Sequence, residues 1–128
     1  MTATDLWPDF KVEKKARSVR HILDEAGGGL KQKTGGVVEF RTHHGGASGD
    51  AAFPFLYLCT LVVPKLGYDY SLLRVVSAPT GFPVRVISDQ GTHGEFADEP
   101  GLLAELAKVF RSERTQQIVQ NLISMATD

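Results

Sequence analysis

The sequence has few of the features that identify a function directly. Its single cysteine, Cys59, lies within an apolar run, which excludes a disulfide framework and zinc-ligand spacing. The longest apolar stretch, FPFLYLCTLVVP, is about half the length that a membrane-spanning helix needs. The N-terminus, MTATDLWPDF, carries acidic residues and lacks the basic and then apolar layout of a signal peptide. These absences predict a cytoplasmic protein with no membrane partner.

A strong charge of either sign is also missing. The formal net charge is −1, which argues against a general nucleic-acid binder that relies on positive charge. Hydrophobic residues make up 42% and charged residues 23% of the chain, both ordinary values for a globular protein. At 128 residues the sequence predicts a single domain over residues 1–128, large enough for one core.

The segment from Lys11 to Thr34 has the spacing of an amphipathic helix. Its apolar residues recur three or four positions apart, and they are Val12, Ala16, Val19, Leu23, Ala26 and Leu30. Gly27, Gly28 and Gly29 each weaken a helix by about 0.5–1 kcal/mol relative to alanine. Leu30 falls back in phase, so we expect a continuous helix. The alternative is a break that ends a shorter helix at Ala26.

A change of period after residue 36 predicts a sheet. VVEFRTH alternates, whereas FLYLCTLVV is apolar on both faces and suits a strand covered on both sides or at a dimer contact. YSLLRVVS and PVRVISD follow, and Gly94 to Phe96 could add a fifth strand. The connections are too short for crossover helices, so the strands form an antiparallel meander.

Two further helices are predicted at the C-terminus. Asp98 caps the first, with Pro100 in its first turn, and Ser112 ends that helix and caps the next. The sequence therefore predicts an α+β fold, with a meander of four or five strands, a long N-terminal helix and two C-terminal helices. Cover on the second face of the sheet would come from the N-terminal segment or from a second subunit, as in a homodimer.

Several short motifs resemble a family of short uncharacterised bacterial proteins. Members begin with Leu-Trp-Pro, share an Ile-Leu-x-Glu helix ending in Lys-Thr, and close on a Phe-x-Ser-Glu-[Lys/Arg]-Thr helix. The matching positions are Leu6, Trp7, Pro8, Ile22, Leu23, Glu25, Lys33, Thr34, Phe110, Ser112, Glu113, Arg114 and Thr115. The glycines at 27–29 depart from this pattern. The resemblance implies a stand-alone bacterial domain and carries no activity, cofactor or catalytic residue.

The stretch THHGGASGD, from Thr42 to Asp50, contains the residue types of an active site. Adjacent strand residues point to opposite faces, so its two histidines cannot both bind one metal ion. A catalytic or ligand site would need residues from elsewhere, and the candidates are His43, His44, Asp50, His93 and Glu95. No metal-ligand spacing is present, and we predict no metal or cofactor. The competing interpretation is a polar hairpin loop between two strands.

Two other candidates for chemistry are disfavoured. Ser48 lies in GGASGD, which matches neither a nucleophile elbow nor a phosphate-binding loop, although glycine-loop amides can hold an anion. Cys59 has apolar neighbours and no adjacent base, which is typical of a buried structural cysteine.

Charge is unevenly distributed along the chain. Lys11 to Lys33 holds seven basic and three acidic residues, whereas Asp89 to Glu105 holds five acidic residues and no lysine or arginine. The basic residues are scattered around their helix, so a solvated face is the simpler interpretation than a nucleic-acid stripe. Trp7 and Phe10 either pack on the domain or contact a partner, and Arg17 and Arg20 are further candidate partner contacts.

These observations favour a non-enzymatic protein-interaction domain of the immunity, antitoxin or adaptor kind, with an unknown protein partner. The alternative is a small-ligand pocket or hydrolytic enzyme that uses His43 or His44, Asp50, His93 and Glu95. Nucleic-acid binding through the basic helix is a third hypothesis. The enzyme hypothesis requires two or more of these polar groups to meet in a concave pocket.

Overall fold

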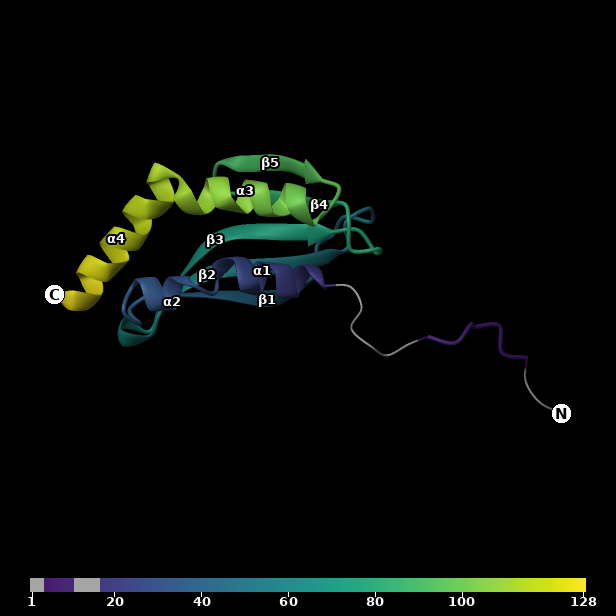
Figure 1. Cartoon of the computed structure of the whole chain (residues 1–128), viewed down its shortest axis with the longest axis horizontal. Helices are drawn as coiled ribbons and strands as arrows, with labels where there is room; N and C mark the ends of the chain where they lie inside the picture. Colours follow the sequence, from purple (N-terminus) through teal and green to yellow (C-terminus); the bar gives the residue numbers. More distant parts are fainter. Residues whose placement is uncertain (1–3, 11–16) are drawn as a thin grey trace.

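The computed structural model describes residues 4–10 and 17–128. Its elements, in chain order, are α1 (Val19–Gly27), α2 (Leu30–Lys33), β1 (Glu39–Ala47), β2 (Phe55–Val63), the 3₁₀ turn η1 (Pro64–Leu66), β3 (Tyr68–Ser77), β4 (Val84–Ser88), β5 (Gly91–Phe96), α3 (Glu99–Arg111) and α4 (Glu113–Thr127). Figure 1 shows α1 and α3 running along the direction of the strands, and α4 turning away from the end of α3.

The five strands form one antiparallel sheet in the order β1-β2-β3-β4-β5, so each strand pairs with its neighbour in sequence. Thr42 lies opposite Cys59, Cys59 opposite Leu73, and Val75 opposite Val86. This arrangement confirms the predicted α+β fold and its meander, including the fifth strand.

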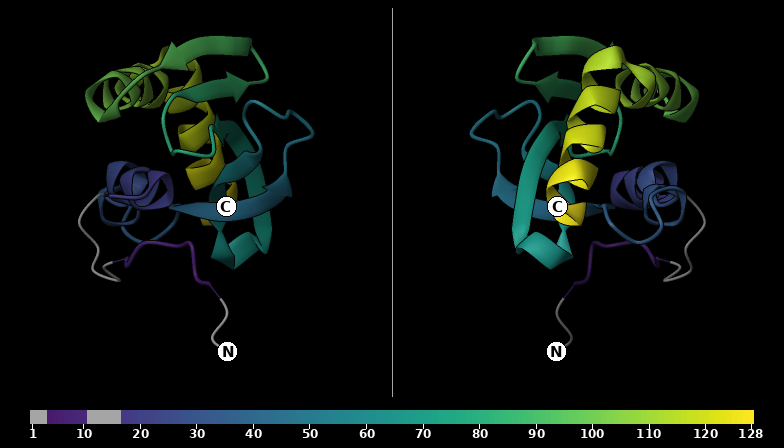
Figure 2. Two further views of the ribbon diagram at one scale, coloured as in Figure 1. Left: turned by 90° about the vertical axis from the view of Figure 1, so that its right-hand side faces the viewer. Right: turned by 90° about the vertical axis from the view of Figure 1, so that its left-hand side faces the viewer.

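The sheet is curved, and both views of Figure 2 show the helices gathered on its concave side. The core lies between these two layers. Its fully buried members include Ile22 and Leu23 from α1, Leu61, Leu73, Val75 and Val86 from the sheet, and Leu102 and Leu106 from α3. Burial of such side chains stabilises a fold by about 1.5–3 kcal/mol each.

The prediction of one continuous helix from Lys11 to Thr34 is wrong in the part that the structure describes. Helix α1 begins at Val19, because Ser18 is extended and its hydroxyl accepts a hydrogen bond from the His21 amide at 3.1 Å. Residues 11–16 of the predicted helix lie outside the described residues. A turn at residues 28–29 then separates α1 from the short α2. The alternative prediction, a shorter helix that ends at Ala26, is closer to the observed end of α1 at Gly27.

Close packing explains the first glycine of this run. A Cβ atom built on Gly27 would lie 2.1 Å from the Phe40 ring, so the ring occupies the space that any side chain would need. Gly29, in contrast, has helical backbone angles and no atom within 4 Å of its Cβ position. Gly27 therefore lets α1 approach β1 closely, whereas Gly29 is not required by packing.

The predicted hairpin loop, between a strand ending at His43 and one beginning after Asp50, is also wrong over most of its length. Strand β1 continues through both histidines and the following glycines to Ala47, and only residues 48–54 form the connection to β2. The strand extends because Ala47 still pairs with Phe55, after an irregularity in register that follows His44.

The second face of the sheet has no helix over it among the described residues. Leu56, Leu58 and Val62 of β2 are half-buried there. Phe53, from the β1–β2 connection, packs under the Arg85 guanidinium at 4.5 Å from the ring centroid. Residues 4–10 do not cover this face, since Trp7 and Phe10 are largely exposed.

The first C-terminal helix begins and ends where the sequence predicts, and the second begins where it predicts. The Asp98 carboxylate accepts a hydrogen bond from the Gly101 amide at 2.9 Å and caps α3. Ser112 ends α3, and its hydroxyl caps α4 by accepting from the Thr115 amide at 3.2 Å. No helix in the described part of the chain is long and apolar enough to cross a bilayer.

Candidate functional site

The five residues proposed for an enzymatic site do not meet in one pocket. Arg85 lies between two of them, with its guanidinium nitrogens 3.6 Å from Asp50 and 2.6 Å from Glu95. These groups belong to the second face of the sheet, where no described helix packs. His93 instead faces the helices, so Asp50 and Glu95 cannot act together with it.

His43 and His44 are both exposed and lie on opposite faces of β1. His43 pairs in register with Leu58 on the face without helices. The His44 ring contacts Tyr57, with ring centroids 5.0 Å apart. Within residues 4–10 and 17–128, no group of three histidine, cysteine or acidic side chains is placed to hold a metal ion.

Ser48 and Cys59 have structural roles. The Ser48 hydroxyl donates to the Phe53 carbonyl and accepts from the Asp50 amide at 3.0 Å, so it organises the β1–β2 connection. Cys59 is fully buried in β2. Burial raises the pKa of its thiol to about 12, which suppresses the nucleophilic thiolate near neutral pH.

His93 lies between two other polar side chains and contacts both of them. Its Nε2 lies 2.6 Å from the Ser88 hydroxyl, and its Nδ1 lies 3.3 Å from a carboxylate oxygen of Glu105. In the tautomer with the proton on Nδ1, Nε2 can accept a hydrogen bond from the Ser88 hydroxyl while Nδ1 faces the Glu105 carboxylate. This is the order of nucleophile, base and orienting acid found in hydrolytic triads.

A small cavity of about 210 Å³ adjoins this arrangement, and we call it the His93 cavity. Ser88, Asp89, Gln90, His93 and Arg114 supply part of its polar lining. The Gln90 amide donates to the Ser88 hydroxyl at 3.1 Å, so this hydroxyl also braces the β4–β5 turn. The hydrogen bond and ion pair with Asp89 raise the pKa of Arg114. The Asp89 carboxylate also balances the positive charge of this guanidinium.

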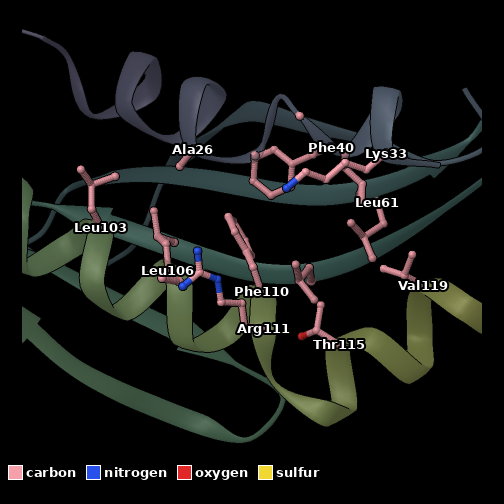
Figure 3. A pocket seen from close by; sticks show the side chains of 15 residues that line it. Ala26, Lys33, Phe40, Leu61, Leu103, Leu106, Phe110, Arg111, Thr115 and Val119 are labelled. Atoms are coloured by element: carbon pink, nitrogen blue, oxygen red, sulfur yellow. The ribbon is translucent and has the colours of Figure 1, made fainter. Parts of the chain in front are cut away.

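A larger groove of about 390 Å³ opens between the N-terminal and C-terminal helices, and we call it the apolar groove. Figure 3 shows α1 and α2 along one side, α3 and α4 along the other, and the sheet behind. Phe40 and Phe110 meet within it edge to face, with centroids 5.3 Å apart. Its other lining residues are Ala26, Gly27, Gly29, Leu30, Lys33, Leu61, Leu72, Leu103, Leu106, Ala107, Arg111, Thr115 and Val119.

Two cations lie at this groove. Lys33 lines the groove from α2, and Arg111 reaches toward it from the end of α3 (Figure 3). Among residues 4–10 and 17–128, neither side chain has a carboxylate partner. The groove therefore combines an apolar lining with positive charge that no described residue neutralises.

The candidate partner-contact residues divide into two pairs. Trp7 and Phe10 are 78% and 70% exposed, so they do not pack on the domain in this structure. Arg17 contacts Glu25 at 3.0 Å and Glu99 at 3.3 Å. Arg20 reaches Asp24 and the Thr42 carbonyl. The two arginines already have partners within the fold, whereas the two aromatic side chains do not.

Sequence reasoning missed Ser88, Glu105, Lys33 and Arg111 as site residues. Glu105 had a detectable signal, because it lies on the apolar face of α3 between Leu102 and Leu106. A carboxylate on such a face needs a partner, and His93 provides one. Lys33 and Arg111 carried no comparable signal, since their proximity to one groove depends on how the helices pack.

Comparisons with models of known protein families, with curated proteins and with solved structures found no match for this chain.

Proposed function

We propose that this chain is a small cytoplasmic, non-enzymatic protein-interaction domain that binds an acidic, apolar segment of a partner protein in the apolar groove. The observation that carries the proposal is the pairing of an apolar lining with two cations that lack carboxylate partners among the described residues. An interaction role of this kind matches that of immunity, antitoxin and adaptor proteins.

The groove suits a peptide better than a small polar metabolite. Its volume is within the range of ligand pockets, yet its lining is mainly aliphatic and aromatic. A helix or turn with bulky side chains would bury its apolar face against Phe40, Phe110 and Leu106. Carboxylates beside those side chains would then face Lys33 and Arg111, which gives orientation and selectivity.

A random-peptide display library tests this proposal without knowledge of the natural partner. We expect the full chain to enrich peptides that combine acidic residues with aromatic or large aliphatic ones. The double variant Lys33→Glu/Arg111→Glu should lose this enrichment. The control Lys65→Glu/Lys108→Glu makes the same charge change at exposed lysines that do not line the groove, and it should retain the enrichment. No enrichment, or the same peptides with the groove variant, would contradict the proposal.

The Ser88–His93–Glu105 arrangement favours a second candidate function, hydrolysis of a small ester. The Ser88 oxygen would attack the carbonyl carbon while its proton passes to His93 Nε2, at the 2.6 Å separation observed. That proton would then leave with the alcohol, and water would hydrolyse the acyl-serine. Glu105, with its side chain 13% exposed, would hold the imidazole in the required tautomer.

A fluorophosphonate probe, which labels activated serines, separates this candidate from a structural network. Hydrolysis predicts stoichiometric labelling of the chain that is lost in Ser88→Ala and in His93→Gln. Labelling should persist in Ser124→Ala, which changes an exposed serine in α4 away from the cavity. If the wild-type chain is not labelled, Ser88 and His93 have only a structural role, which is to hold the β4–β5 turn against α3.

A further inference from the structure

The N-terminal segment presents apolar side chains that nothing described covers. Leu6 is 88% exposed, Trp7 78% and Phe10 70%, and they lie within five consecutive residues. Figure 1 shows this segment extending away from the body of the domain. Contiguous large apolar groups that are exposed on a protein mark an interaction site.

The same segment has local order and negative charge. The Asp5 carboxylate accepts a hydrogen bond from the Trp7 amide at 3.0 Å, which forms an Asx turn around Leu6. The Trp7 and Phe10 rings lie 6.3 Å apart and form one apolar unit, with Pro8 restricting the backbone between them. Asp9 adds a second carboxylate beside this unit. A segment ordered in this way loses less conformational entropy when it binds.

These properties complement those of the apolar groove. We infer that the segment Thr4–Phe10 of one copy of this chain docks in the apolar groove of a second copy. Trp7 and Phe10 would contact the lining that includes Phe40 and Phe110, and Asp5 and Asp9 would face Lys33 and Arg111. This inference rests on the proposed function, because it assigns an occupant to the same groove.

The position of this segment favours docking in the groove of a second copy over docking in the groove of its own chain. In Figure 1 residues 4–10 lie away from the body of the domain, beyond the N-terminal end of α1, whereas α2, which lines the groove, lies at the C-terminal end of that helix. Reciprocal exchange between two copies would give two identical contacts related by a twofold axis and a closed dimer.

A labelled peptide with the sequence TDLWPDF tests the contact. The receptor is the full chain carrying Trp7→Ala and Phe10→Ala, which leaves its groove unchanged and removes its own competing segment. We expect saturable binding in fluorescence anisotropy. Adding Lys33→Glu/Arg111→Glu to this receptor should weaken binding at least tenfold, and adding Lys65→Glu/Lys108→Glu should leave it unchanged. A peptide with lysine at both aspartate positions should bind the Lys33→Glu/Arg111→Glu receptor better than the original peptide does. Absence of binding to the receptor would overturn the inference.

Light scattering of the full-length chain then identifies which copy supplies the segment. We expect wild type to form a dimer, and the Trp7→Ala/Phe10→Ala and Lys33→Glu/Arg111→Glu chains each to be monomers. A mixture of these two variants should form a dimer through the one remaining contact. A monomeric wild type at concentrations well above the peptide dissociation constant would overturn docking between copies.

The two proposals fail in distinguishable ways. If the display library enriches acidic aromatic peptides that depend on the groove but TDLWPDF does not bind, only the self-docking inference is wrong. If neither the library nor the peptide binds the groove, both proposals are wrong.

Discussion

Two cavities lie side by side on the helix-covered face of the sheet, and they differ in whether their charged residues have partners within the fold. They share Leu72 and Thr115 as lining residues. In the His93 cavity, Glu105 contacts His93 and Asp89 pairs with Arg114. In the apolar groove, Lys33 and Arg111 have no carboxylate partner among the described residues. The charged groups of the first cavity therefore pair with one another, whereas those at the groove are open to a ligand.

The largest expected effect concerns Cys59, in the sheet behind both cavities. Because burial raises the pKa of its thiol from about 9 to about 12, its thiolate should be about a thousandfold rarer at pH 8 than in the unfolded chain. Reaction with a disulfide reagent should therefore be slow in buffer and complete in denaturant. Rapid labelling of the folded chain would contradict the burial of Cys59.

Titration of the Cys59 thiol should also make the free energy of unfolding depend on pH. The folded chain binds this proton more tightly than the unfolded chain, so the stabilisation is fully present below about pH 9 and is lost as pH rises toward about 12. Urea denaturation of wild type and Cys59→Ala over this range measures it. The alanine variant should lack this part of the decline, and parallel curves would contradict it.

The next prediction concerns Gly27, which lines the apolar groove where α1 ends. Gly27→Ala should destabilise the chain by about 1–3 kcal/mol, because its methyl group would overlap the Phe40 ring. Gly29→Ala is the matched control, since its backbone is helical and its Cβ position is free. We expect it to stabilise the chain by about 0.5 kcal/mol, through the lower entropy of the unfolded state. Equal unfolding midpoints for the two variants would contradict this account of the glycine run.

The contrast between these glycines also shows how far the sequence could predict the structure. Periodicity predicted the strand order and the C-terminal helices, because alternation and capping by Asp98 and Ser112 are local properties. It could not separate Gly27 from Gly29, since only the position of Phe40 distinguishes them. It also placed a loop at His44, where pairing with Tyr57 continues the strand. The candidate sites depend on such non-local contacts even more strongly.

A smaller effect is expected in the His93 cavity. Glu105→Gln keeps the shape of the side chain but removes the charge that orients His93, so it should cost about 1 kcal/mol of unfolding free energy. Glu25→Gln serves as the control, because Glu25 is 60% exposed in its contacts with Arg17 and His21. Exposed pairs of this kind contribute about 0–1 kcal/mol. A Glu105 variant as stable as the control would mean that the network does not brace the fold.

The smallest effect on stability should come from the cations at the groove. Lys33→Gln and Arg111→Gln should each change the unfolding free energy by no more than about 0.5 kcal/mol, because neither breaks an ion pair with a described residue. The main loss would be the favourable position of Arg111 in the last turn of α3. The same variants should weaken the binding of acidic peptides, so binding and stability would change independently. A loss of stability as large as that of Glu105→Gln would show that these cations serve the fold, and the distinction between the two cavities would no longer hold.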